Sequence, residues 1–237
     1  MAIIRNKIPL LVMIVFFFKY YETGKKYRNI DAQNLQLIDK FFITAEINDW
    51  ALQSYADNFT RIIMDNPDKS KYPLDKMVEF VKNRGNRWID VTEAMFKSYR
   101  WMALKFMMPH RSFVFDYSMP NRFNPELDHI FPINLEGADK EYQQFVDTIW
   151  NMQPVKGEIN NWKKNFHPRD FLKDLVKNAA GETINGSKFK EDYDFVPDLS
   201  DSSWNDYKQF IDNRRKVMME YVKTQYDISI IPEDNPS

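Results

Sequence analysis

Residues 127–163 carry the pattern on which the predicted fold and function of this chain depend. It opens as Leu127-Asp128-His129-Ile130-Phe131-Pro132 and, after an insert, continues as Asn151-Met152-Gln153-Pro154-Val155. Asn160 follows Asn151 by nine positions, and Lys163 comes three further on. We expect one strand ending at the Asp-His pair, a second over 151–155, and a helix that begins soon after Pro154.

The predicted helix has a basic face. Lys156, Asn160, Lys163 and Lys164 are spaced at i, i+4, i+7 and i+8, so they share one side of a helix. That side would present an amide oxygen beside several cations, as a phosphate-binding surface needs. If the helix begins only at Gly157, Lys156 drops out of this group.

The order and types of these residues resemble the HNH nuclease motif, also called the ββα-metal motif. The resemblance covers 37 of the 237 residues. It implies the two short strands and the helix expected above. It also implies that His129 is the general base, that Asp128 and Asn160 bind a metal ion, and that Asn151 holds the His129 ring in place. Asn161 is the adjacent alternative to Asn160, but the spacing favours Asn160.

The chemistry of phosphodiester hydrolysis explains these residue types. The reaction needs a base that deprotonates water, and positive charge on the phosphate and the leaving oxygen. Histidine suits the base because its ordinary pKa of about 6.5 leaves it largely neutral at cellular pH. Carboxylate and amide oxygens suit Mg²⁺ or Mn²⁺. The resemblance therefore implies one divalent ion, with DNA as the partner.

The chain has no cysteine. Many HNH proteins carry two Cys-x-x-Cys pairs on a structural zinc, whereas here Val155, Lys156 and Ile159 lie in that neighbourhood. We therefore expect a variant without structural zinc, stabilised by packing alone. The lack of cysteine also favours a reducing, cytoplasmic setting.

A second resemblance concerns the whole arrangement. A helical chain that ends in a cysteine-free Asp-His and Asn module is similar to the C-terminal part of modification-dependent restriction proteins of the GmrSD kind. These proteins also have a ParB-like nucleotide-binding domain, and no ParB-like or P-loop signature is apparent in this sequence. The resemblance implies a role in restriction or phage defence, with a ParB-like domain or subunit as partner.

Composition and apolar spacing predict a mainly α protein with a small α+β (ββα-metal) nuclease module. With 43% hydrophobic and 16% aromatic residues, the chain can bury one large core or two modest ones. We expect a helical domain over 1–110, the nuclease module over 111–180, and a C-terminal loop and helix over 181–237 that pack on the rest. Apolar stripes and breaks predict helices throughout 29–108, the first around the stripe of Leu37 to Phe42 and the next over 50–64, 73–84 and 91–108. Further helices are predicted over 171–179 and 203–226, and a strand over 112–117.

The N-terminus combines two basic residues with the apolar run Ile8 to Phe18. No small-residue cleavage site follows the run, and eleven residues are too few to span a bilayer, which takes about 20. We expect a buried helix that opens at Pro9, and no membrane partner.

The net charge of −1 hides an uneven distribution. Residues 1–125 carry 19 basic and 13 acidic residues, whereas residues 126–237 carry 14 and 21. Within the acidic half, 154–190 has eight basic and four acidic residues, so the predicted motif helix lies in a locally basic stretch. The insert before it is acidic, and we expect that acid to face away from DNA.

Two rival interpretations belong to other functional classes. In one, the motif is structural and the chain binds nucleic acid without cutting it, independently of His129. In the other, the chain is a helical interaction protein and the match is accidental. The second interpretation predicts that Asp128, His129 and Asn160 do not converge in space.

Overall fold

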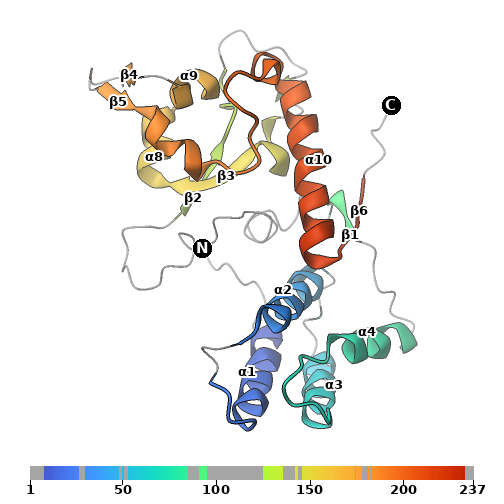
Figure 1. The fold of residues 1–237 in the computed structure, drawn as a ribbon. Coiled ribbons are helices and arrows are strands. Elements are labelled where there is room, and N and C mark those ends of the chain that lie inside the picture. The colour runs from blue at the N-terminus through green and yellow to red at the C-terminus, as the bar shows by residue number, and fades with distance from the viewer. Residues whose placement is uncertain are drawn as a thin grey trace. The chain divides into compact units, whose positions relative to one another are not determined.

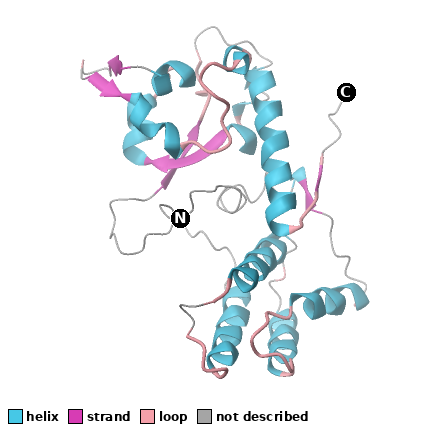
Figure 2. Cartoon of the chain, in the orientation of Figure 1, coloured by secondary structure: helices cyan, strands magenta, loops and turns pink. Residues whose placement is uncertain are grey.

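The computed structural model describes residues 8–26, 30–47, 50, 53–84, 91–94, 125–135, 142–143, 146–173, 175–177, 181 and 183–232. These residues are mostly helical, with three small two-stranded sheets (Figures 1 and 2). The predicted class, mainly α with a small α+β part, is confirmed at this level. The strand predicted over 112–117 lies outside the described residues.

The chain forms two compact units, residues 1–102 with 222–237, and residues 103–221. The sequence predicts boundaries near 110 and 180. Helix α10, Tyr207–Tyr226, contributes its first three quarters to the second unit and its last turn to the first. The segment after residue 180 is therefore shared between the two units.

The first unit is built from helices α1 (Ile8–Tyr21), α2 (Ala32–Ile47), α3 (Gln53–Met64) and α4 (Leu74–Asn83). Their apolar stripes meet in an aromatic core, in which the Phe41 ring lies 5.8 Å from Phe59 and 5.6 Å from Tyr72. Helices predicted from these stripes are confirmed for α2, α3 and α4, and Met77 and Val81 of α4 are buried.

The predicted helix over 91–108 is wrong at its start. Val91 and Thr92 form strand β1, which pairs in parallel with β6, Ile230–Ile231. β-branched residues favour extended backbone, and a strand partner from the far end of the chain decides the outcome. Residues 95–108 lie outside the described part.

Helix α1 is buried on one side only. Val12, Phe16 and Tyr20 lie in the core, whereas Leu11 and Phe18 are exposed. The sequence predicts a buried helix that opens at Pro9; in the structure the helix begins at Ile8 and one of its faces is buried. None of the described helices, α1 included, is both long and apolar enough to cross a membrane.

The second unit contains the segment that carries the motif. Strand β2 (Pro125–His129) pairs antiparallel with β3 (Met152–Lys156), which follows the 3-10 turn η3 (Ile149–Asn151). Helix α8 (Gly157–Lys163) follows β3 directly and packs on both strands. The strands and the helix predicted from the sequence are present, although Asn151 ends the turn and the second strand starts at Met152.

The rest of the second unit begins with helix α9, Pro168–Lys173. The antiparallel strands β4 (Leu175–Lys177) and β5 (Thr183–Asn185) follow, and then the 3-10 helices η4 (Gly186–Asp192) and η5 (Ser202–Asn205). The sequence predicts one helix over 171–179, whereas α9 ends at Lys173 and strand β4 begins at Leu175. Helix α10 begins at Tyr207 rather than at Ser203, because η5 occupies the first turn.

Helix α10 joins the motif through one buried cation, Arg214. Its guanidinium donates hydrogen bonds to the carbonyls of Trp150 (2.7 Å), Met152 (3.0 Å) and Asp194 (3.2 Å), and to Gln153 Oε1 (2.9 Å). Burial lowers the pKa of Arg214 to about 9, although the negative charge of Asp194 acts to raise it. These bonds fix the start of β3 against α10.

Candidate functional site

The candidate site is the contact between α8 and β2. Side chains alternate along a strand, so Glu126 and Asp128 point to the same face of β2. Asn160 and Lys163 lie one turn apart on α8. Asn160 Nδ2 donates to Glu126 Oε2 at 2.9 Å, and Lys163 Nζ donates to Asp128 Oδ1 at 2.9 Å. The helix and the strand thus meet in two successive polar pairs.

The Asp128–Lys163 pair is buried. Asp128 is 4% exposed and Lys163 is 1% exposed. Lys163 Nζ also donates to the carbonyl of His129 at 2.6 Å, and the hydroxyl of Tyr193 donates to Asp128 Oδ2 at 2.9 Å. Burial lowers the pKa of Lys163, while the charge of Asp128 opposes this shift. Each carboxylate oxygen therefore has a donor within the protein.

Burial corrects the role predicted for Lys163. The sequence predicts a surface cation that contacts phosphate, but the side chain lies inside the protein on Asp128. The predicted group also loses Lys156, which is the last residue of β3 because α8 begins at Gly157. Lys164 remains exposed just after the helix, with a φ of 44°.

His129 is the last residue of β2. The strand ends there, and the next residue, Ile130, donates its N–H to the carbonyl of Asn151 at 2.7 Å. The ring is 20% exposed, and its Nε2 lies 3.2 Å from Asp147 Oδ1, on a carboxylate that is 66% exposed. In the sequence Asp147 is only one of the acids of the insert. No local pattern marks it as a partner of His129, so the sequence does not predict it.

Asn151 is fully buried. Its Nδ2 donates to the carbonyls of Phe131 (2.9 Å) and Val146 (2.8 Å), and its Oδ1 accepts from the N–H of Phe131 (2.9 Å). The sequence resemblance implies that Asn151 holds the His129 ring in place. In the described residues its side chain binds backbone on both sides of the site, two residues after His129 and one before Asp147.

The oxygen atoms near α8 are of the kind that bind Mg²⁺ or Mn²⁺. The amide nitrogen of Asn160 is engaged by Glu126, and within the described part of the chain its oxygen receives no hydrogen bond. No group of three or more His, Cys, Asp or Glu side chains in that part could hold a metal. The sequence resemblance implies an ion on Asp128 and Asn160 that keeps water or substrate oxygens in its other positions, as Mg²⁺ commonly does. In the described residues both oxygens of Asp128 are engaged, by Lys163 and by Tyr193, so an ion could bind Asp128 only in place of these donors.

Two further residues of the site, Glu126 and Tyr193, differ in whether they could be predicted from the sequence. Glu126 lies two positions before Asp128, so strand alternation alone could have placed it on the same face. Tyr193 lies 65 positions after Asp128, and no local pattern marks it. The loop that carries Tyr193 also gives Asp194, whose carboxylate accepts from Gln153 Nε2 at 3.2 Å. Gln153 is the cross-strand partner of Asp128. The consecutive residues Tyr193 and Asp194 therefore bind the two side chains that face each other across β2 and β3.

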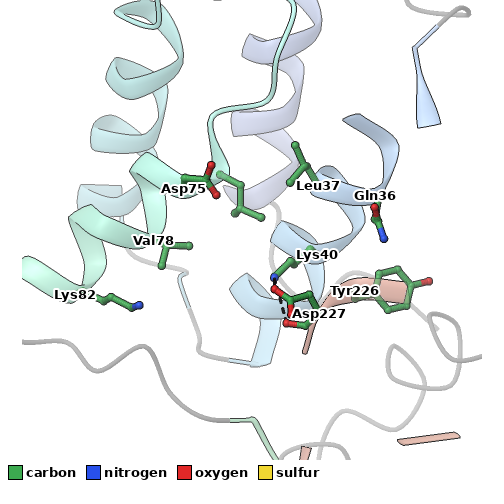
Figure 3. A pocket seen from close by; sticks show the side chains of 9 residues that line it. Gln36, Leu37, Lys40, Asp75, Val78, Lys82, Tyr226 and Asp227 are labelled. Carbon is green, nitrogen blue, oxygen red and sulfur yellow. Dashed lines mark hydrogen bonds and ion pairs between the residues drawn. The ribbon is translucent and has the colours of Figure 1, made fainter. Parts of the chain in front are cut away.

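A separate cavity of about 520 Å³ lies in the first unit (Figure 3). Lys40 Nζ binds both the carboxylate of Asp227, at 2.8 Å, and its carbonyl, and Gln36 donates to the carbonyl of Gln225. These bonds satisfy carbonyls at the end of α10. We therefore interpret the contacts of Gln36 and Lys40 in this cavity as a helix cap.

Comparison of the chain with models of known families, with curated proteins and with solved structures finds no match in any of the three.

Proposed function

We propose that this chain is a metal-dependent endonuclease of the HNH type that hydrolyses phosphodiester bonds in DNA. The observation that carries the proposal is the β2–β3–α8 unit itself. The predicted motif residues lie on its elements: Asp128 and His129 at the end of β2, Asn151 in the turn η3 directly before β3, and Asn160 and Lys163 in α8. Lys163 contacts both the Asp128 carboxylate and the carbonyl of His129.

In this proposal His129 is the general base. Its ring lies at the end of β2, is partly exposed, and can accept a proton from a water molecule at its surface. The water oxygen then forms a bond to phosphorus, and the bond from phosphorus to the leaving sugar oxygen breaks. A divalent ion held by Asp128 and Asn160 would supply positive charge to the phosphate and the leaving oxygen.

The wider biological role follows from the GmrSD resemblance. We propose action in restriction or phage defence, in the cytoplasm, with a ParB-like domain or subunit as partner. The lack of cysteine suits a reducing compartment and an architecture without structural zinc. Lys164 is the exposed cation next to α8 that we assign to phosphate contact.

The alternative is a module that binds nucleic acid without cutting it. One observation favours it, namely that Lys163 already occupies the Asp128 carboxylate. An ammonium there can replace the charge of a divalent ion and give the motif a purely structural role.

Cleavage of DNA with added metal tests the proposal. Supercoiled plasmid and phage DNA with modified bases are incubated with the chain in Mg²⁺ or Mn²⁺, with and without EDTA. We expect nicked or linear product that disappears with EDTA. Cutting that persists in EDTA would contradict the metal assignment. Binding without cutting of both substrates would favour the alternative.

A further inference from the structure

We propose that Asp147 is a positioning residue that orients the His129 ring for its role as general base. This inference rests on the proposed function and adds a residue to its machinery. Among the residues that the structure describes, Asp147 is the one whose polar atoms reach the ring, with Oδ1 3.2 Å from Nε2. The pair joins the end of β2 to the insert that precedes β3.

The backbone on both sides of the pair is held by one buried side chain. Asn151 binds the carbonyl of Val146, directly before Asp147, and both backbone polar groups of Phe131, two residues after His129. Because Asn151 is fully buried, these three bonds are shielded from competing water. Asn151 therefore fixes the separation between the two chain segments that carry His129 and Asp147.

A second set of contacts holds the insert against the loop after His129. The hydroxyl of Tyr142, a buried residue, donates to the carbonyl of Pro132 at 2.5 Å. Gln143 Nε2 donates to the carbonyl of Ile133 at 3.1 Å. The insert is thus tied to this loop at several points, and the approach of Asp147 to the ring follows from that docking.

The contact assigns a role to each ring nitrogen. An ionised carboxylate only accepts hydrogen bonds, so Nε2 carries the hydrogen that faces Asp147. Nδ1 then keeps its lone pair and is the nitrogen that takes the proton from water. Once it has done so the ring is a cation, and the nearby carboxylate stabilises it. Asp147 therefore serves both ring orientation and charge.

The experiment uses the full chain, three variants at position 147, one control variant and His129→Gln. Asp147→Ala removes the carboxylate, Asp147→Asn keeps an oxygen acceptor without charge, and Asp147→Glu keeps the charge. Asp170→Ala, which removes an exposed acid of the same unit, is the matched control. Each variant is measured by single-turnover DNA cleavage and by NMR of protein labelled with ¹⁵N-histidine. Only three histidines contribute signals, and His129→Gln identifies that of His129.

We expect a protected Nε2–H signal from His129 in the native chain, its loss in Asp147→Ala, and its return in Asp147→Glu. The cleavage rate should fall on the order of tenfold to a hundredfold in Asp147→Ala, less than for complete loss of a general base. The cleavage rate of Asp147→Asn should lie between those of Asp147→Ala and the native chain, and the rate of Asp170→Ala should match that of the native chain.

The outcomes separate this inference from the proposed function. Cleavage that is lost in His129→Gln but unchanged in Asp147→Ala would overturn the role of Asp147 alone. An identical His129 spectrum in the native chain and in Asp147→Ala would do the same. Cleavage that survives in His129→Gln would overturn both.

Discussion

Lys163 and Asp128 form a buried ion pair, in which Nζ lies 2.9 Å from Oδ1 and neither side chain is more than 4% exposed. The pair joins the last turn of α8 to β2. Taking two charges out of water costs free energy that their attraction only offsets when hydrogen bonds complete the shell. Tyr193 and the carbonyl of His129 complete it here. The pair is therefore a structural element of the site and not a surface contact.

Removing one charge of this pair should strongly destabilise the chain. Lys163→Met keeps the length of the side chain and leaves Asp128 buried without a counter-charge, at a cost of about 3–5 kcal/mol. Lys164→Met, at the exposed neighbouring position, should change the free energy of unfolding by less than about 0.5 kcal/mol. Urea unfolding measures both. Equal stability of the two variants would contradict the buried pair.

Tyr193 should contribute through its hydroxyl alone. Tyr193→Phe keeps the ring and removes the hydrogen bond to a buried carboxylate, which is worth about 1.5–3 kcal/mol. Tyr21, an exposed tyrosine of α1, serves as the control in Tyr21→Phe. Thermal unfolding should show a larger loss for Tyr193→Phe. A loss no greater than that of the control would show that the hydroxyl does not bind Asp128.

Gly186 should tolerate no side chain. A Cβ there would lie 1.5 Å from the carbonyl oxygen of Phe171, which is backbone of α9 and cannot rotate away. Gly186→Ala should therefore destabilise the chain by about 1–3 kcal/mol or more. At Gly157 the nearest atom is the flexible carboxylate of Glu126, so Gly157→Ala should cost much less. The reverse order in chemical denaturation would rule out the close approach of α9 and η4.

Stability should fall at mildly acidic pH because of His167. Burial lowers the pKa of this ring, and the charge of Asp170 opposes the shift. The unfolded chain therefore binds more protons at this position below about pH 6.5, so stability is present above that pH and is lost as the pH falls through the lowered value. His167→Gln should show a smaller loss between about pH 7 and pH 5 in urea unfolding. The same pH dependence in both proteins would exclude this origin.

The sequence predicts local structure at the site better than its side-chain partners. The strands around Asp128 and Gln153 and the helix at Asn160 follow from short-range patterns, and the structure has them. The burial of Lys163 does not follow from such a pattern, because a lysine on a short helix is usually exposed and its partner on β2 is not apparent from the sequence. Tyr193 and the pairing of Val91 with Ile230 depend on contacts between distant parts of the chain, which no local pattern encodes.

The role of His129 is the central claim, and the loss of its imidazole tests it most directly. The initial rate of plasmid cleavage in Mg²⁺ or Mn²⁺ is compared between the native chain, His129→Ala, and Asp170→Ala as the control at an exposed position of the same unit. The account predicts a fall of at least about a hundredfold in His129→Ala, with the native rate in Asp170→Ala and a folded protein in both cases. Cleavage by folded His129→Ala at the native rate would contradict it.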